Sequence, residues 1–135
     1  KTEYVLTAED LLRRQKFDDM FCQSNYPVDI HASTIGEAEK FPGIYQKGYP
    51  KGKSYGISYR SLLPVGTQNL LVAGRCISGT HRAHASYRVM TICMAMGEAV
   101  GVAAAMCAAE GVAPRKLNVK KLQNRLTNKG IELYG

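Results

Sequence analysis

The sequence predicts a mixed α/β (α+β) fold, chiefly from residues 69–109. This stretch opens with the apolar run at 70–73, closed by Gly74, which favours a strand buried on both faces. Residues 87–109 are apolar almost all round and rich in Ala and Gly, as in a helix buried within a larger fold. About ten small and polar residues join the two. We therefore expect a strand, a polar turn and a helix whose N-terminus faces an anionic or electron-rich group.

The preceding part of the chain contributes a strand and a short helix. Residues 2–6 are typical of a strand, and Thr7 is the expected N-cap of the helix that follows. Asp10, three residues later, has the spacing of a capping box. Asp18 and Asp19 indicate a solvated helix turn rather than a catalytic pair, because an acid and a base need different environments.

A candidate catalytic pair follows Pro27, which starts an extended segment. Alternation places Asp29 and His31 on the face opposite Val28 and Ile30. An aspartate can orient an imidazole for proton transfer, since the pKa of histidine lies near neutrality. The alternative is a histidine at a surface or interface, and periodicity does not separate the two.

The boundaries of the remaining elements are predicted mainly from glycine and proline, which interrupt helices and strands. Residues 32–53 are loop-like, and residues 54–63 predict a strand that enters a turn. Gly111 is expected to end the long helix, and Asn118 to cap a last one.

We expect Ser86 to cap the long helix, which leaves the first-turn amides of Tyr87, Arg88, Val89 and Met90 without intrahelical acceptors. Such a terminus suits a phosphate, an oxyanion or an anionic ring edge, and Arg88 adds positive charge. An ordinary helix start with an exposed arginine is the alternative.

Charge and residue content allow nucleic-acid, membrane and metal binding to be weighed from the sequence. The net charge of +7 permits an anionic partner, so the alternative function is a basic interaction module that binds nucleic acid through residues 47–53 and 115–125. Salt-dependent oligonucleotide binding would reveal it. The scattered charges and lack of an RNA-binding motif favour no nucleic-acid partner. Glu98 disfavours a membrane span, and His81 and His84 lack a clear third ligand, so no metal site is expected.

Several motifs together resemble one family. The motifs are NLLVAGR at 69–75, ASYRVM at 85–90 and MGEAVGVAA at 96–104, with YPVDIH at 26–31 and YRSLLP at 59–64 upstream. This set resembles the C-terminal part of bacterial FAD-dependent oxidoreductases of the glutathione-reductase-like superfamily. The resemblance implies a two-domain, Rossmann-like flavoprotein with FAD as cofactor and a small-molecule substrate.

The same resemblance implies roles for individual residues. The amides near Val89 and Met90 would face the pyrimidine edge of the flavin, and Gly74 would permit close approach of the cofactor. Many relatives have Asp after this glycine, whereas this chain has Arg75, which could instead meet a phosphate. Ser86 and Arg88 complete the expected cofactor-binding set.

The chain is therefore expected to be a C-terminal fragment. Residues 1–66 would belong to the substrate domain, 67–113 to the FAD-binding domain, and 114–135 to a final helix and tail. No G-x-G-x-x-G motif occurs, so the partner would be an N-terminal half that holds the ADP part of FAD. We expect the fragment alone to bind FAD poorly, to lack activity and to self-associate. Four cysteines without a framework indicate a reducing compartment, hence the cytoplasm.

Overall fold

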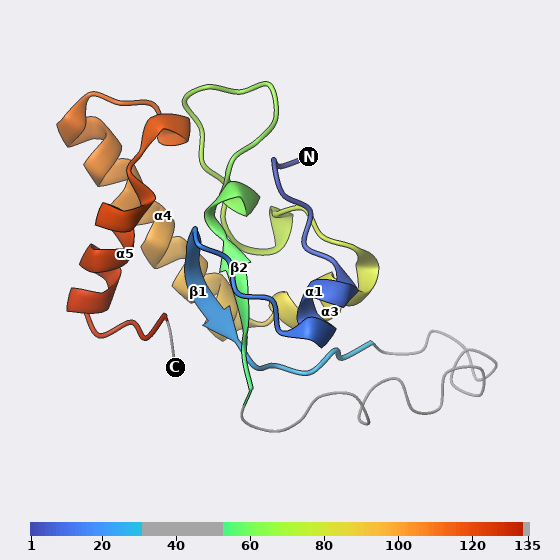
Figure 1. The fold of residues 1–135 in the computed structure, drawn as a ribbon. Helices are drawn as coiled ribbons and strands as arrows, with labels where there is room; N and C mark the ends of the chain where they lie inside the picture. Colours follow the sequence, from blue (N-terminus) through green and yellow to red (C-terminus); the bar gives the residue numbers. More distant parts are fainter. Residues whose placement is uncertain (31–52, 134–135) are drawn as a thin grey trace, which may run out of the picture.

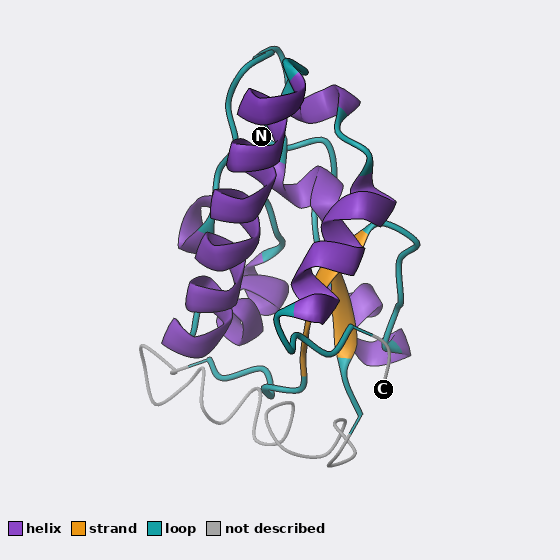
Figure 2. Cartoon of the chain, turned by 90° about the vertical axis from the view of Figure 1, so that its left-hand side faces the viewer, coloured by secondary structure: helices purple, strands orange, loops and turns teal. Residues whose placement is uncertain are grey.

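A small antiparallel sheet lies between two pairs of helices in the computed structural model, which describes residues 1–30 and 53–133. The elements in order are α1 (Ala8–Arg13), β1 (Met20–Ser24), β2 (Tyr55–Ser58), η1 (Tyr59–Leu62), η2 (Gly74–Cys76), α3 (His81–Tyr87), α4 (Met90–Glu110), η3 (Pro114–Lys116) and α5 (Val119–Asn128). Helices α4 and α5 lie on one side of the sheet and α1 and α3 on the other (Figure 1). The side view in Figure 2 shows α4 and α5 next to each other in front of the strands. The mixed α+β class is confirmed.

The capping box at the start of α1 is confirmed. The Thr7 side chain accepts a hydrogen bond from the Asp10 amide, and the Asp10 carboxylate accepts from the Thr7 amide at 2.8 Å. The helix ends at Arg13, so Asp18 and Asp19 lie in the turn before β1 and not in a helix. Residues 2–6 form two isolated bridges rather than a regular strand, one from Thr2 and one from Leu6.

The sheet consists of one predicted strand and one that the sequence analysis missed. β2 lies within the predicted strand at 54–63, and η1 replaces the rest of that prediction. Every residue of β2 is buried because helices cover both faces of the sheet. Its partner β1 carries the irregularity of a bulge between Met20 and Cys22, which obscures the period-two pattern in the sequence.

The predicted strand at 70–73 is wrong. This segment has no regular secondary structure, and Leu70 is 47% exposed. The Val72 amide donates to the Leu62 carbonyl at 2.9 Å, but no strand in the described part of the chain pairs with it. A strand buried on both faces needs such neighbours for its backbone groups.

Within this chain the long helix is buried on one side only, and its expected burial within a larger fold stays a prediction. The buried residues of α4 form one stripe against β1 and α5, composed of Ile92, Met96, Ala99, Ala103, Met106 and Cys107. The outer face exposes Met90 and Met94 by 74% and 73%. By length and composition α4 could cross a membrane, yet a core helix of a soluble protein meets the same criterion, and 33% of its most apolar window is buried.

The C-terminal elements follow the prediction. Gly111 ends α4 in the left-handed region at φ 64°, and the Asn118 side chain caps α5 by accepting from the Lys121 amide at 3.2 Å. Leu122 and Leu126 of α5 are fully buried. One hydrophobic core includes residues of all three predicted segments, and the domain division at 66 and 113 stays a prediction.

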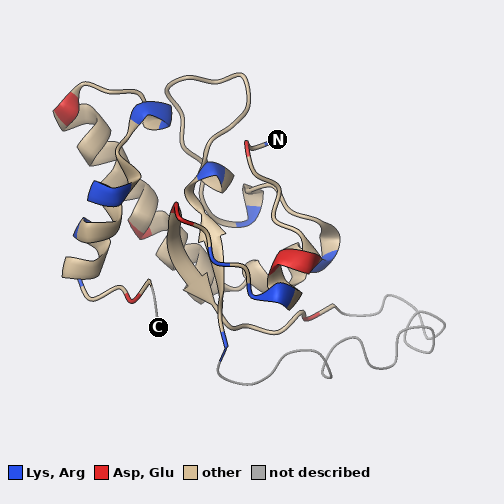
Figure 3. Cartoon of the chain, viewed as in Figure 1, with Lys and Arg blue, Asp and Glu red and all other residues tan. Residues whose placement is uncertain are grey.

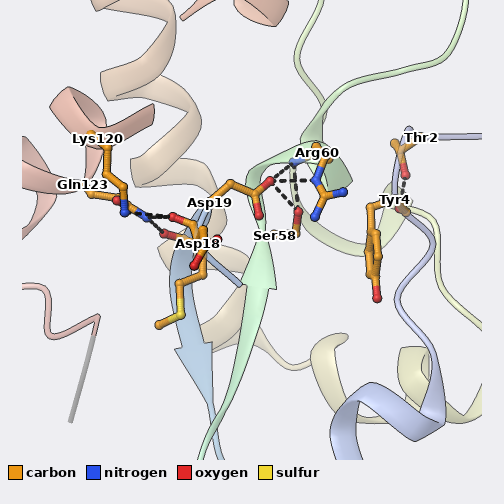
Figure 4. Close-up of polar contacts among 9 residues, drawn as sticks. Thr2, Tyr4, Asp18, Asp19, Ser58, Arg60, Lys120 and Gln123 are labelled. Carbon is orange, nitrogen blue, oxygen red and sulfur yellow. Dashed lines mark hydrogen bonds and ion pairs between the residues drawn. The ribbon is translucent and has the colours of Figure 1, made fainter. Parts of the chain in front are cut away.

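The turn before β1 is held from two sides, as Figure 4 shows. The Asp19 carboxylate accepts hydrogen bonds from the Ser58 hydroxyl at 2.7 Å and from Arg60 Nε at 2.9 Å. From the other side, Gln123 of α5 donates to the backbone carbonyl of Asp18 at 2.8 Å. Burial by itself would raise the pKa of Asp19, but the hydrogen bonds from Arg60 and Ser58 outweigh it and lower the pKa below its ordinary value.

Replacing Asp19 by Asn is expected to lower the free energy of unfolding at neutral pH by about 1 kcal/mol, a modest value because the Arg60 side chain is half exposed. Since the folded pKa is depressed, the stabilisation is present above the unfolded pKa of about 3.9 and is lost as pH falls through the folded value. Urea unfolding of both proteins from pH 7 to pH 2 measures the difference. Asp18→Asn is the matched control, with an expected change within about 0.5 kcal/mol. An equal loss for both variants would contradict the assignment to Asp19.

Candidate functional site

The centre of the candidate site is a break between two helices. Thr80 caps α3 by accepting a hydrogen bond from the Ala83 amide, and this helix ends at Tyr87. Arg88 keeps helical angles, and Val89 is extended at ψ 151° before α4 begins at Met90. The single helix predicted from Tyr87 is therefore wrong, because Thr80 starts a separate helix before it.

Ser86 does not cap a helix, which corrects a second prediction. It lies inside α3, is fully buried, and donates to the Tyr26 carbonyl at 2.6 Å. Its hydroxyl is 2.7 Å from the hydroxyl of Tyr55. Since the single Ser86 proton goes to Tyr26, the Tyr55 hydroxyl is the donor in this second bond. Ser86 thus fastens the chain around Tyr26 to α3 and β2.

The same chain segment brings Asp29 to the helix break. Arg88 Nη2 donates to the Asp29 carbonyl at 3.1 Å and lies 3.6 Å from the Asp29 carboxylate. The Asp29 amide donates to the Ala85 carbonyl at 3.3 Å. Both side chains of the ion pair are partly open to solvent. The structure thus joins a residue predicted for catalysis to one predicted for the cofactor, while His31 lies outside the described residues.

Three of the predicted cofactor residues share one open pocket of about 610 Å³. Gly74, Arg75 and Met90 line it, and the other lining residues are Ala73, Cys76, Cys93 and Met94. Gly74 has φ +85°, a conformation that residues with a side chain rarely adopt. Its amide is 3.3 Å from the Met96 sulfur, a contact that helps hold η2 against α4.

The pocket is positively polarised. Arg75 lines it and donates from Nε to the Arg88 carbonyl at 2.9 Å, which ties η2 to the helix break. Helix α4 begins at Met90, and its first-turn amides have no intrahelical acceptor by helix geometry. The Val89 side chain makes no capping hydrogen bond to these amides. No acidic side chain belongs to the described lining, so the pocket suits an anionic or electron-rich group.

Four residues that line this pocket were not predicted from the sequence as site residues: Ala73, Cys76, Cys93 and Met94. Cys93 and Met94 follow Met90 by three and four positions, which places them on the same helix face. This spacing from Met90 could have predicted from the sequence that both residues line the pocket. The approach of Cys76 from η2 had no such signal, because it depends on how η2 packs against α4.

The two histidines of α3 show no metal-binding arrangement. His81 is exposed at the helix start, and the His84 ring contacts the Tyr87 ring edge-on at 5.2 Å between centroids. Within residues 1–30 and 53–133, no group of three His, Cys, Asp or Glu side chains could hold a metal ion.

Acidic positions lie among the basic ones along the described part of the chain (Figure 3). Arg115 forms an ion pair with Glu3 and donates to the Pro64 and Thr67 carbonyls. Lys121 lies 3.4 Å from the Glu110 carboxylate. Two basic side chains of the proposed nucleic-acid surface at 115–125 thus have partners within the chain. Of the other proposed segment, residues 47–52 lie outside the described residues.

Comparisons with known proteins give one match. The family model described as FAD dependent oxidoreductase matches residues 1–126. No curated protein and no solved structure matches the chain.

Proposed function

Because the chain belongs to the FAD-dependent oxidoreductase family, we propose that its pocket at the start of α4 receives the pyrimidine edge of the flavin. The observation that carries the proposal is that Gly74, Arg75 and Met90, expected separately from the sequence to contact the cofactor, line the same pocket. The substrate of this proposal is a small molecule.

The pocket residues suit the flavin for three physical reasons. Gly74 presents no side chain, so the backbone can approach a ring closely. The Arg75 guanidinium and the first-turn amides of α4 favour negative charge on the ring edge. When bound, FAD supplies the redox chemistry by accepting or donating a hydride equivalent. The role of the chain is then to orient the ring and to stabilise the charge that develops on its pyrimidine edge.

On the substrate side, we assign proton transfer to His31 and orientation to Asp29. The support is the position of Asp29 beside Arg88, at the helix break that leads directly into the proposed flavin pocket. A carboxylate held there by an arginine can orient a neighbouring imidazole.

The proposal includes a larger bacterial, cytoplasmic enzyme of Rossmann-like, glutathione-reductase-like type, in which this chain is the C-terminal part. An N-terminal half would bind the ADP part of FAD and cover the outer face of α4. Two features support such a partner: the exposed Met90 and Met94, and the segment at 70–73, which pairs with no strand in the described part of the chain. Without it, we expect the chain to bind FAD weakly and to self-associate through that face.

The test uses two glycines of like conformation. Gly74 and Gly66 have φ of +85° and +80°, but only Gly74 borders the pocket, and a Cβ on Gly66 would meet nothing within 4 Å. In the complete flavoprotein, Gly74→Leu is expected to lower bound FAD at least tenfold, measured by absorbance per protein. Gly66→Leu places the same backbone strain outside the pocket and is expected to retain FAD. Equal flavin content in the two variants, both folded by circular dichroism, would contradict the proposal.

A further inference from the structure

A second pocket, of about 480 Å³, lies beside the first turns of α4, on the side away from the proposed flavin pocket. Its residues on the helix are Thr91, Ile92 and Ala95, none of which lines the flavin pocket. At about 100° per residue, they lie on the opposite side of the helix from the residues that do. The other lining residues come from the end of β1, the two residues after it, Ser54 and Glu132. Four segments that are distant in sequence therefore build this pocket.

Part of the pocket wall is a fixed hydrogen-bond network. Gln23 Oε1 accepts from Lys16 Nζ and from the Ser54 hydroxyl, both at 2.6 Å. Gln23 Nε2 donates to the Glu132 carbonyl at 3.0 Å. Lys16 also donates to the Ser54 hydroxyl at 2.8 Å, although it does not itself line the pocket. Because these bonds tie β1 to residues 54 and 132, the pocket is formed before any ligand binds.

Four side chains around this network offer polar groups to a ligand. They are exposed, and none of their polar groups makes a hydrogen bond or ion pair within residues 1–30 and 53–133. These groups are the Asn25 amide, the Tyr26 hydroxyl, the Thr91 hydroxyl and the Glu132 carboxylate. The amide and the hydroxyls both donate and accept, whereas the carboxylate only accepts. The pocket therefore presents donors and acceptors together to whatever enters it.

We propose that this pocket binds a small neutral molecule with several hydroxyl groups, a monosaccharide or a sugar alcohol. A hydroxyl group both donates and accepts, so several of them can pair with an amide, other hydroxyls and a carboxylate at once. Among the described lining residues, Glu132 is the only charged one and six are neutral and polar, which disfavours an anionic ligand. The Tyr26 ring can cover the apolar C–H face of such a molecule. The inference goes beyond the proposed flavin function and does not rest on it.

The experiment is saturation-transfer difference NMR on the 135-residue chain, with D-glucose, D-mannose, D-galactose, D-xylose and D-sorbitol as probes. We expect at least one probe to bind with a dissociation constant on the order of 1 mM, the range for a ligand of about a dozen non-hydrogen atoms. The double variant Asn25→Ala/Thr91→Ala is expected to weaken its binding about tenfold, because two hydrogen-bonding groups are lost. The matched control, Thr127→Ala/Asn128→Ala, removes the same residue types from the exposed end of α5, outside the pocket, and should retain wild-type affinity.

The charge of the ligand is tested with Glu132→Gln, which keeps an acceptor but removes the negative charge. We expect this variant to bind the neutral probe within about threefold of wild type. Tighter binding of D-glucosamine than of D-glucose, lost in Glu132→Gln, would assign the pocket to cations and overturn the proposal. No binding of any probe up to about 50 mM, or equal affinity in the two double variants, would also overturn it. The flavin proposal is tested separately by FAD content, so the failure of one is distinguishable from the failure of the other.

Discussion

Replacing Tyr87 by Ala is expected to lower the free energy of unfolding by about 3–5 kcal/mol, measured by chemical denaturation followed by circular dichroism. Tyr87 is the last residue of α3 and is 1% exposed. Its hydroxyl donates to the Ile77 carbonyl at 2.9 Å, and its ring lies so close to Gly79 that a Cβ there would be 2.6 Å from the ring. Burial raises the pKa of Tyr87 to about 12, so this donor keeps its proton at neutral pH. Loss of the ring would leave a cavity beside the helix break that positions Arg88.

Two variants separate the contributions of the ring and the hydroxyl. Tyr87→Phe keeps the ring and leaves the Ile77 carbonyl without this donor, so the expected loss is about 1 kcal/mol. Leu12→Ala removes an apolar side chain that is 58% exposed, and we expect a change within about 0.5 kcal/mol. A Tyr87→Ala cost no greater than that of Tyr87→Phe would show that the ring does not stabilise the fold.

Replacing His31 by Ala in the complete flavoprotein is expected to slow flavin reduction or reoxidation by substrate about a hundredfold or more, the usual effect of losing a general acid or base. The proposed partner Asp29 lies at the helix break, held by Arg88. Because His31 is assigned to proton transfer and not to cofactor binding, FAD content should remain unchanged. Stopped-flow measurement of flavin absorbance follows both half-reactions.

His81→Ala is the control for this prediction, because His81 is exposed at the start of α3 and does not line the proposed flavin pocket. It should retain wild-type rates. Wild-type turnover in the His31 variant would show that another group transfers the proton, and His84 would be the next residue to replace.

Much of the local structure could be predicted from short stretches of sequence. Thr7 with Asp10, Gly111 and Asn118 each act on backbone groups within a few residues, and the structure confirms all of these helix boundaries. The missed start of α3 at Thr80 was of the same local kind. For the site, the family motifs singled out Gly74, Arg75 and Met90, which line the pocket together.

Contacts between distant segments decided the role of Ser86 and the conformation of residues 70–73. Ser86 has the residue type of an N-cap, but the carbonyl of Tyr26 and the hydroxyl of Tyr55 give it a buried role inside α3. Likewise, the apolar side chains of residues 70–73 suit a buried strand. A strand also needs neighbouring strands for its backbone hydrogen bonds, and a local pattern does not specify them.

The long helix shows this division most clearly. Its apolar character and its end at Gly111 could be predicted from the sequence itself, whereas its start at Met90 could not. Which side of it is buried was decided only by its packing against β1 and α5, since apolar residues occur on every side. Periodicity selects a buried face only when polarity differs between faces. On α4 that difference is absent, and the tertiary structure leaves Met90 and Met94 exposed beside the pocket.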